Sequence, residues 1–489
     1  MTTLPALCVD LDGTLVKSDT LVDSTLALAR HRPALILRLP GWLFEGKAAL
    51  KRHIADAVQL DVAHLPYNRE LLQFLEQERS TGRDIYLATA SDAATAQRVA
   101  DHLGIFTAVL ASDGVVNLAG HNKLAAFREQ FGENFCYIGN AMPDLPLLEC
   151  CHEPMVANPT AGLTSALRRS GVVPVRTFRE QEPLAKAWLR AIRLHQWAKN
   201  VLIFLPLLLA HAWSRGPMTG AVLAFFSFGL CASATYIIND LLDLEADRQH
   251  PRKRRRPFAS GDLSAISGIA VIGLFLLTSL ALAIALPHLV RLVAPDQPLS
   301  HPYDFVMWLG VYAVSTLAYS LRFKRSMLVD VIVLSGLYTI RLIAGSAASD
   351  VPISPWLGGF SIFFFLSLAF AKRFAELESL RQRGGSIAKG RGYQIGDLEQ
   401  LRSFGTAAGY ASVVVFTLYI SNLDADAAQH YTHIRRLWLL VPILLLWLSR
   451  LWLLASRGEL NEDPVVYAVT DRRSLLLGLM VVAIVLSAL

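Results

Sequence analysis

The segment Tyr236-Ile237-Ile238-Asn239-Asp240-Leu241-Leu242-Asp243-Leu244-Glu245-Ala246-Asp247 decides how this chain folds. It starts at the end of an apolar stretch and continues into acidic residues. If the stretch is a helix that continues through the segment, spacings of three and four residues place Asn239, Asp240, Asp243 and Asp247 on one face. Stacked carboxylates repel one another, so the pattern predicts a Mg²⁺ ion that bridges them to an anionic ligand such as a diphosphate. The alternative is a solvated acidic face beside the basic run 250–257.

The apolar stretch is one of several, because hydrophobic residues make up 53% of the 489 residues and the mean hydropathy is +0.40. This composition is too apolar for a soluble protein. We expect an N-terminal α/β domain at 1–175, a linker at 176–194 and an all-α polytopic membrane domain at 195–489. The net charge of +6 does not indicate nucleic-acid binding, because the basic residues lie beside apolar spans.

About nine transmembrane helices are expected, since each span needs about 20 apolar residues. We place them near 197–213, 219–238, 265–286, 304–320, 328–348, 355–371, 404–421, 437–455 and 473–489. The loops at 239–264, 321–327, 372–403 and 456–473 carry 6, 3, 7 and 3 Lys or Arg residues. The positive-inside rule puts these loops in the cytosol, the N-terminus inside and the C-terminus outside. The first residues show no signal peptide pattern, so the N-terminal domain is expected to be cytoplasmic.

The N-terminal domain opens with a short apolar run, Leu4–Val9, followed by Asp10-Leu11-Asp12-Gly13-Thr14. Such a run predicts a buried parallel strand that ends in a loop. Two acids at one strand end can act as a pair: Asp10 would attack a phosphorus atom, and Asp12 would protonate the leaving oxygen. The crowded charge predicts Mg²⁺ here too. An ordinary strand-to-turn sequence is the alternative for this motif taken alone.

Residues 4–160 resemble the haloacid dehalogenase superfamily of phosphatases, whose Rossmann-like domain carries further motifs in a fixed order. Thr89 ends a second predicted strand, 85–88, and matches the family's hydroxyl that binds the phosphoryl group. Lys123 matches the lysine that holds nucleophile and phosphate together. The largely helical stretch at about 18–78 resembles the family's cap.

The metal-binding motif of that family departs from its usual form in this sequence. After a strand at 135–138, the segment Gly139-Asn140-Ala141-Met142-Pro143-Asp144 carries Asn140 where the family usually has an acid. The resemblance implies that Asp10, Asp12, Asn140 and Asp144 bind Mg²⁺. An amide oxygen can still be a ligand, but the loss of one negative charge weakens the site. A structural domain without catalysis is therefore an alternative.

Residues 190–489 resemble the UbiA superfamily of intramembrane prenyltransferases, whose signature is NDxxDxxxD followed by a basic segment that ends in Arg-Pro. The resemblance implies that Asn239, Asp240, Asp243 and Asp247 hold Mg²⁺ and a diphosphate. Further pieces resemble the decaprenyl-phosphate phosphoribosyltransferases within it, among them 195–200, the pattern 239–257 and Asp330, which stands without a second DxxxD cluster at 319–345. In that subgroup the substrates are phosphoribosyl diphosphate and a polyprenyl phosphate.

Joining these substrates requires binding sites for three anionic groups, and the sequence has many basic residues near the expected cytosolic face. Taken singly, most would also serve as topological anchors. Arg341 and Lys372 lie in or at the end of apolar spans, where a charge is costly. The candidate substrate-binding residues are Lys199, Lys253, Arg254, Arg256, Tyr319, Lys324, Asp330, Arg341, Lys372 and Arg373.

The fusion predicts a bifunctional enzyme of a bacterial inner membrane. The membrane domain would join phosphoribosyl diphosphate to a polyprenyl phosphate, and the tethered phosphatase would remove the ribose 5-phosphate. One alternative is a UbiA-type enzyme that prenylates an aromatic acceptor. Another is a transferase whose N-terminal domain is a non-catalytic scaffold. Assembly into a homo-oligomer is left open.

Overall fold

The computed structural model describes residues 4–382, 392–422, 431–460 and 464–488. The loop predicted at 372–403 therefore lies partly outside the described residues. By packing, the chain divides into two compact units, Met1–Ile192 with Tyr236–Ile272, and Arg193–Thr235 with Gly273–Leu489. The boundaries that the sequence predicts between domain, linker and membrane domain stay a prediction. The acidic segment 236–247 thus packs with the N-terminal residues, although the helix that leads into it begins in the other unit.

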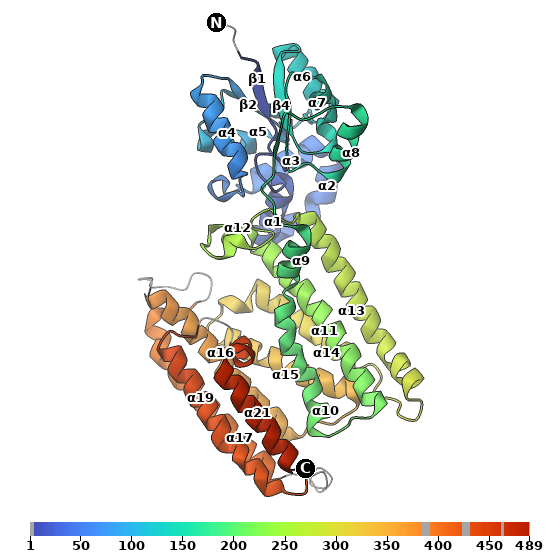
Figure 1. Cartoon of the computed structure of the whole chain (residues 1–489), viewed down its shortest axis with the longest axis vertical. Helices are drawn as coiled ribbons and strands as arrows, with labels where there is room; N and C mark the ends of the chain where they lie inside the picture. Colours follow the sequence, from blue (N-terminus) through green and yellow to red (C-terminus); the bar gives the residue numbers. More distant parts are fainter. Residues whose placement is uncertain (1–3, 383–391, 423–430, 461–463, 489) are drawn as a thin grey trace. The chain divides into compact units, whose positions relative to one another are not determined.

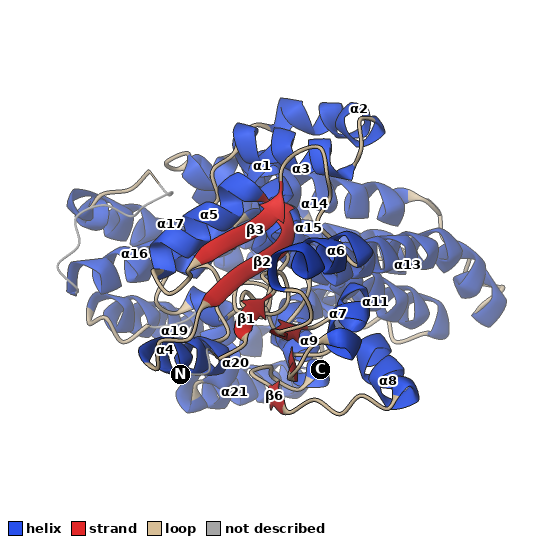
Figure 2. Cartoon of the chain, turned by 90° about the horizontal axis from the view of Figure 1, so that it is seen from above, coloured by secondary structure: helices blue, strands red, loops and turns tan. Residues whose placement is uncertain are grey.

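The first unit is built on a parallel sheet. Within residues 4–192, the sheet has six strands in the order β3-β2-β1-β4-β5-β6, and every pair is parallel. Figure 2 shows the strands lying side by side among the helices. The strands are β1 (Ala6–Val9), β2 (Ile85–Asp92), β3 (Ala108–Ser112), β4 (Phe135–Gly139), β5 (Pro154–Ala157) and β6 (Arg176–Phe178).

Both faces of the sheet are buried, which explains why its strands are apolar without alternation. Leu7 and Val9 point into one core with Leu87, whereas Cys8 points into the opposite core with Phe127. Helices supply the rest of each core. They are α4 (Arg69–Ser80), α5 (Ala93–Leu103), α6 (His121–Phe131), α7 (Leu145–Cys150) and α8 (Ala161–Ser170).

A helical insertion follows β1, as predicted. It comprises α1 (Thr20–His31), the 3-10 helix η1 (Pro33–Arg38), α2 (Leu39–Phe44) and α3 (Lys47–Ala57), and the 3-10 turn η2 (Val62–His64) leads back to α4. Asp19 caps α1 by accepting a hydrogen bond from the backbone of Val22. Helix α1 ends at His31, just before Pro33, whose ring cannot continue it. The α/β class with a helical insertion is thereby confirmed.

A smaller core, separate from the two cores of the sheet, joins the end of the N-terminal residues to the acidic segment. Ala187 and Ala191 of α9 (Leu184–Ile192) pack against Leu241, Leu244 and Phe258. Helix α12 (Leu244–Gln249) and the 3-10 turn η5 (Lys253–Arg255) belong to this part. The stretch predicted as a linker therefore contains β6 and α9.

The second unit is helical (Figure 1). Among the described residues, seven helices are long and apolar enough to cross a membrane: Arg215–Leu242 (α11), Ala265–Val293 (α13), Asp304–Leu321 (α14), Val329–Ser349 (α15), Pro355–Gln382 (α16), Ile395–Ser421 (η7 and α17) and Ile434–Ser456 (η8 and α19). They match seven of the predicted spans. The all-α polytopic class is confirmed, and the number nine is approximate.

The other two predicted spans take shorter forms. The last is α21 (Arg472–Ala488), which has 17 residues and follows α20 (Pro464–Thr470). The first, predicted at 197–213, is an irregular segment made of the 3-10 helix η4 (Leu194–Phe204) and the five-residue helix α10 (Leu205–Leu209). Pro206 lies in the first turn of α10, the part of a helix in which a proline ring fits without loss of a hydrogen bond.

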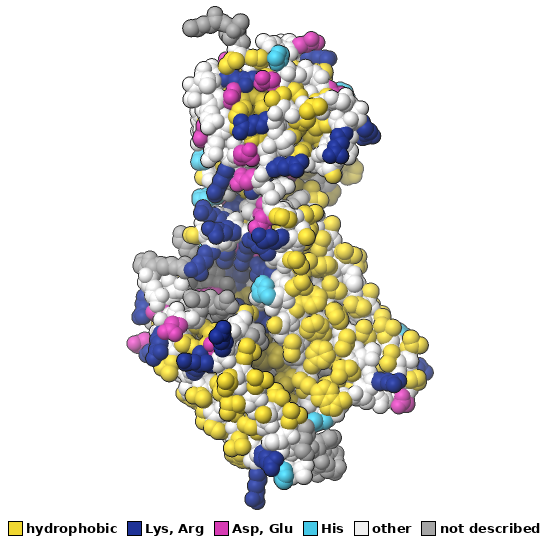
Figure 3. All heavy atoms as spheres, in the orientation of Figure 1, with side chains coloured by type: hydrophobic (Ala, Val, Ile, Leu, Met, Phe, Trp, Pro, Cys, Tyr) yellow, Lys and Arg dark blue, Asp and Glu magenta, His cyan; other side chains and the backbone are white. Residues whose placement is uncertain are grey.

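Apolar side chains cover much of the visible surface of the helices (Figure 3). In α13 the most apolar window is only 17% buried, and Leu274 and Leu277 are 60% and 70% exposed. A contiguous apolar surface of this kind is unstable in water and stable in lipid. The chain is a multi-pass membrane protein.

Close packing in the helical unit depends on a glycine in α15. A Cβ at Gly345 would lie 2.1 Å from the carbonyl oxygen of Ile203 in η4. Small residues let helical segments approach each other in this way inside membranes. Gly336 also lies in α15, but a Cβ placed on it would have no described atom of another element within 4 Å.

Gly345→Val should therefore destabilise the protein by about 1–3 kcal/mol or more, because the valine side chain must push η4 away. The measurement is thermal unfolding of the detergent-solubilised protein. Gly336→Val, on the same helix, is the matched control and should change the melting temperature little. Equal melting temperatures for the two variants would contradict the packing.

Candidate functional site

The predicted catalytic acids of the N-terminal domain lie at the carboxyl edge of the sheet, where ligands of open α/β sheets bind. Asp10 follows β1, which lies between β2 and β4. Thr89 lies in β2, and Asn140 follows β4. The backbone N–H of Asp10 donates to the carbonyl oxygen of Ile138 at 3.0 Å, which ties the residue to the neighbouring strand. The sheet order alone brings these distant residues to one edge.

Lys123 links two of the predicted acids. Its Nζ lies 2.8 Å from Oδ1 of Asp10 and 3.8 Å from Oδ1 of Asp144, and it also donates to the hydroxyl of Tyr137 at 2.9 Å. The Tyr137 hydroxyl in turn donates to Asp144 at 2.7 Å. All four side chains are buried. One ammonium thus faces two carboxylates in a site shielded from water.

Burial controls the charge of these groups. It raises the pKa of Asp10, and the nearby Lys123 opposes the rise. For Lys123 the order is reversed: burial lowers its pKa, but the carboxylates of Asp10 and Asp144 outweigh this and leave the pKa raised. Lys123 is therefore held as a cation, and a further positive charge at the site would favour ionised Asp10.

The second acid of the pair, Asp12, faces the helical insertion. Its Oδ1 accepts a hydrogen bond from the backbone of Thr20 at 2.7 Å, and its Oδ2 accepts one from the hydroxyl of Ser91. The hydroxyls of Thr20 and Ser91 are 2.8 Å apart. Thr89 is buried, and its Oγ1 accepts from the backbone of Ser91 at 3.0 Å. The Asp12 carboxylate is therefore held from two sides, by Ser91 near the end of β2 and by Thr20 at the start of α1.

Asn140 lies against the loop of the first motif. A Cβ at Gly13 would be 2.0 Å from Nδ2 of Asn140, and the φ of Gly13 is +74°, so only glycine fits there. The backbone N–H groups of Asn140 and Ala141 both donate to Oδ2 of Asp144 at 3.0 Å. Asp144 thus shapes the turn that presents Asn140.

The donor set at this edge fits Mg²⁺. Carboxylate and amide oxygens are its preferred ligands, and Asp10, Asp12 and Asp144 bring more negative charge than Lys123 neutralises. Within the part of the chain that the structure describes, no group of three or more His, Cys, Asp or Glu side chains is already arranged as a metal site. Metal binding by Asp10, Asp12, Asn140 and Asp144 therefore stays a proposal.

Two residues of this site were not predicted. Tyr137 is buried in β4, and its position between Lys123 and Asp144 depends on the pairing of β4 with β1. Ser91 belongs to the part of β2 that extends beyond the predicted strand end. A polar residue in an apolar strand was the available signal for Tyr137. No local signal identifies Ser91.

The acidic segment forms an almost continuous helix. Helix α11 ends at Leu242, Asp243 leaves helical geometry with φ −98° and ψ 13°, and α12 begins at Leu244. The backbone nevertheless keeps the helical hydrogen-bond spacing, from Asp243 to Asn239 at 3.0 Å and from Asp247 to Asp243 at 2.8 Å. Of the four residues that the sequence predicts on one face, Asn239, Asp243 and Asp247 thus follow one another at the helical hydrogen-bond spacing through a small break.

Cations neutralise this column. Nη1 of Arg256 lies 2.9 Å from Asp240 and 2.6 Å from Asp247, and Lys253 is 3.9 Å from Asp247. Arg30 of α1 is 3.3 Å from Oδ1 of Asp243. Burial raises the pKa of Asp247, and Arg256 and Lys253 oppose the rise. The predicted residues Arg256 and Lys253 therefore lie at the motif, together with Arg30, which the sequence did not indicate.

These carboxylates also fit a hard divalent cation. Asp240 and Asp247 are each 2% exposed, and a guanidinium stands between them where a positive charge is required. Their oxygens are the donors that Mg²⁺ favours, with phosphate oxygens of a substrate completing the shell. Arg254, another predicted substrate-binding residue, lies in η5, two residues before Arg256.

In the helical unit, Asp330 and Arg373 form a buried ion pair. Nε of Arg373 donates to Asp330, and its Nη2 donates to the hydroxyl of Tyr319 at 2.6 Å. Tyr393, which was not predicted, donates to the other oxygen of Asp330 at 2.5 Å. Asp330 is 0% exposed and Arg373 is 1% exposed. Three predicted residues thus come together in one hydrogen-bonded network.

Elsewhere in the same unit, two cations, Arg341 and Lys199, lie near the ring of Tyr338. Arg341 is 4% exposed and donates to Asn200 and to Tyr312, each at 3.0 Å. The Lys199 ammonium lies 5.6 Å from the ring centre of Tyr338, and the Arg341 guanidinium lies 5.7 Å from the same ring. Both are predicted substrate-binding residues. The remaining two, Lys324 and Lys372, lie in η6 (Phe323–Arg325) and α16.

Lys123→Met should destabilise the N-terminal domain by about 3–5 kcal/mol, because it leaves Asp10 and Asp144 buried without their cation. The measurement is the melting temperature at neutral pH without added metal. The double variant Asp10→Asn/Lys123→Met removes one of the unpaired charges and should recover part of the loss. If the double variant is less stable than Lys123→Met, the charge argument fails.

The chain is similar to known proteins over most of its length. The chain is 38% identical over 481 residues to the uncharacterized protein y4nM of Sinorhizobium fredii, covering 98% of this chain and 90% of that protein. It is 31% identical over 302 residues to the decaprenyl-phosphate phosphoribosyltransferase of Mycobacterium tuberculosis, covering 60% of this chain and 92% of that enzyme. A solved phospho-aspartyl intermediate analogue of phosphoserine phosphatase aligns with 37% of this chain and 96% of its own, with a TM-score of 0.26 and 12% identity. Residues 201–470, more than half of the chain, match the UbiA prenyltransferase family, to which this protein belongs.

Proposed function

We propose that the chain is a Mg²⁺-dependent phosphoribosyltransferase fused to a phosphatase. In the first reaction, a phosphate oxygen of a polyprenyl phosphate attacks the anomeric carbon of phosphoribosyl diphosphate. The bond from this carbon to the diphosphate breaks, and diphosphate leaves. In the second reaction, water hydrolyses the phosphate ester at the 5-position of the ribose. Inorganic phosphate leaves, and polyprenyl-phosphate ribose remains.

The observation that carries the proposal is the pairing of Asp330. An ordinary prenyltransferase of this superfamily would be expected to use a second acidic cluster in the region 319–345. Here Asp330 is the one acidic residue in the sequence 319–345, and it is buried against Arg373 and Tyr393, so this region lacks the several carboxylates that a second metal site would need. A single acidic motif with many cations suits a substrate with separate phosphate groups better than a single prenyl diphosphate.

The similarity to the mycobacterial enzyme supports the same substrates. The matched region spans 92% of that protein, so the likeness extends over nearly its entire length. The cations of the helical unit agree with it. Arg341 and Lys199 are buried, and a buried cation is costly unless it is paired or serves binding.

Each group in the first reaction has a proposed role. Asn239, Asp240, Asp243 and Asp247 would hold the metal with the diphosphate, and the metal would neutralise the charge that develops on this leaving group. Lys253, Arg254 and Arg256 would bind phosphate oxygens beside the motif. Tyr319, Lys324, Asp330, Arg341, Lys372, Arg373 and Lys199 would bind or position the ribose 5-phosphate and the lipid phosphate.

The second reaction would use the edge of the sheet. Asp10 would attack the phosphorus atom, and the bond from phosphorus to the ribose oxygen would break. Asp12, held by Thr20 and Ser91, would give its proton to that oxygen. Lys123 and Thr89 would hold the phosphoryl group. Water would then hydrolyse the aspartyl phosphate and restore Asp10.

The orientation of the chain in the membrane is inferred from the charge pattern of its loops. We infer a bacterial inner membrane, with the N-terminal domain in the cytoplasm and the C-terminus outside. Phosphoribosyl diphosphate is a water-soluble substrate, whereas the polyprenyl phosphate comes from the bilayer. Both reactions would then take place at the cytoplasmic face, where the intermediate is accessible to the tethered phosphatase.

Asp243→Asn should reduce phosphoribosyl transfer by roughly 100-fold or more, because it weakens binding of the Mg²⁺ ion that would neutralise the leaving diphosphate. The assay follows radiolabel from phosphoribosyl diphosphate into lipid, with purified protein, polyprenyl phosphate and Mg²⁺. Glu245→Gln, two residues away and paired with His31 at the surface, is the matched control and should keep nearly full activity.

Absence of labelled lipid with the wild-type protein would contradict the first reaction. Formation of a prenylated product from prenyl diphosphate and an aromatic acceptor would then favour the alternative enzyme.

Asp10→Asn should abolish release of inorganic phosphate and leave the phosphoribosylated lipid to accumulate, because the nucleophile is lost. The measurement is phosphate release together with separation of the two lipid products. Asn140→Asp serves as a second variant: it should lower the Mg²⁺ concentration for half-maximal release by about tenfold or more, since it adds a charge near the metal. A wild-type protein that releases no phosphate, while Asn140→Asp does, would indicate a decayed domain.

A further inference from the structure

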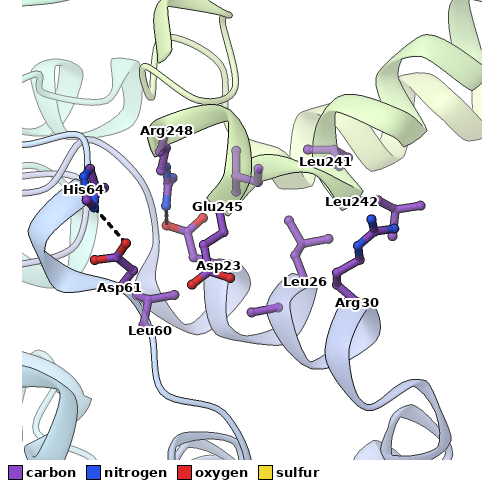
Figure 4. A pocket seen from close by; sticks show the side chains of 12 residues that line it. Asp23, Leu26, Arg30, Leu60, Asp61, His64, Leu241, Leu242, Glu245 and Arg248 are labelled. Carbon is purple, nitrogen blue, oxygen red and sulfur yellow. Dashed lines mark hydrogen bonds and ion pairs between the residues drawn. The ribbon is translucent and has the colours of Figure 1, made fainter. Parts of the chain in front are cut away.

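The acidic motif of the transferase packs against the helical insertion of the N-terminal domain. Residues 236–272 belong to the same compact unit as residues 1–192. Within this unit α12 lies against α1 and η2, and a small hollow between them is lined by residues of both segments (Figure 4). Arg248 and Gln249 of α12 have no role in the reactions proposed above.

A buried ion pair holds α12 in place. Nη1 of Arg248 lies 2.8 Å from Oδ2 of Asp23, and the residues are 7% and 3% exposed (Figure 4). Ser18 donates to the same carboxylate at 2.6 Å and accepts from Nη2 of Arg248 at 3.1 Å. Such a pair persists in a folded protein only where its geometry is closely specified. The position of α12, and with it of Asp247, is therefore tied to α1.

Further contacts extend the interface on both sides of this pair. Gln249 donates to Asp61, next to η2, at 2.8 Å. Leu26 of α1 packs against the small core that contains Leu241 and Leu244. The interface thus combines a polar clamp with an apolar contact, which is typical of a specified docking surface.

Arg30 reaches from the same helix to the motif itself. Its Nη2 lies 3.3 Å from Oδ1 of Asp243, and the two side chains are 15% and 18% exposed. Figure 4 shows Arg30 extending from the end of α1 toward the turn after Leu242. Asp240 and Asp247 share Arg256 from the loop that follows the motif, whereas Arg30, a cation at Asp243, comes from the N-terminal domain.

Carboxylates that bind metals are oriented by hydrogen-bond donors outside the metal's own ligand shell, and loss of such a donor typically costs 10–100-fold in metal affinity. Arg30 would act on Asp243 in a comparable way through its ion pair, in which Nη2 lies 3.3 Å from Oδ1. A guanidinium on Oδ1 restricts the rotation of the carboxylate at the point where the helix breaks between α11 and α12.

We propose that Arg30 is a positioning residue of the transferase's magnesium–diphosphate site, and that the N-terminal domain is a structural component of that site independently of its own chemistry. The inference rests on the proposed function in one respect, the binding of metal by Asp243. It assigns α1 a second role: one end of the helix carries Thr20, which holds Asp12, and the other end carries Arg30, which holds Asp243.

The test measures metal binding on the full-length protein. Mn²⁺ with inorganic diphosphate is the probe, and bound Mn²⁺ is measured by electron paramagnetic resonance in an Asp10→Asn background, which weakens binding at the sheet. Arg30→Ala should weaken Mn²⁺ binding by about 10–100-fold, and Arg30→Lys should weaken it less, because lysine keeps the charge but not the planar geometry. Arg32→Ala, at the exposed end of the same helix, is the matched control and should bind as the parent does.

A double-mutant cycle separates positioning from general destabilisation. In an Asp243→Asn background, Arg30→Ala should have no further effect on Mn²⁺ affinity. Unchanged or tighter binding in Arg30→Ala overturns the proposal, and so does an equal loss in the Asp243→Asn background. If Arg30→Ala does not fold, as judged by thermal unfolding, the same comparisons are made with Arg30→Lys, for which parent-like affinity would refute the inference.

The outcomes also separate the inference from the proposed function. Binding that depends on Arg30 in a protein that makes no phosphoribosylated lipid would leave the inference standing and remove the function. If wild type and Arg30→Ala form labelled lipid with the same Mg²⁺ dependence, the proposed function stands and the inference about Arg30 is refuted.

Discussion

Buried carboxylates must be neutralised, and this constraint governs both candidate sites. At the edge of the sheet, Asp10 and Asp144 share Lys123. At the acidic motif, Asp240 and Asp247 share Arg256. An uncompensated buried charge costs several kcal/mol, so each carboxylate requires either a protein cation or a metal ion. The cations seen in the structure therefore mark where positive charge is needed, and where a metal with an anionic substrate would have to be accommodated.

The same constraint determines which elements the cations join. Lys123 lies on α6 and donates to Asp10, which follows β1, and to Tyr137, which belongs to β4. It therefore joins one helix to two strands. Arg373 likewise joins α16 to α15 through Asp330. Each cation makes several hydrogen bonds, and the loss of any partner leaves the others buried without compensation. Charge pairing thus fixes the relative positions of elements that are far apart in sequence.

Much of the fold could be predicted from local patterns. Apolar runs with parallel-sheet character identified β1, β2 and β4, and seven long apolar stretches identified seven helices that could cross a membrane. The conformation of residues 197–213 was harder to predict, because their apolar composition suits a membrane span. That conformation instead follows from Pro206 and from the close approach of Ile203 to Gly345, which is a tertiary contact. Strand ends were also uncertain: β2 continues to Asp92 because its last residue pairs with β3.

The sequence by itself determined the chemical types of the two sites. The spacing of Asn239, Asp243 and Asp247 follows from helical geometry, and Asp10 and Asp12 follow a buried strand, so both patterns are local. Only the tertiary structure decided which cations serve which acids. Arg30 is separated from Asp243 by more than two hundred residues, and nothing near it in the sequence distinguishes it from other arginines on amphipathic helices. Charge pairing acts through space, so it depends on how the whole chain packs.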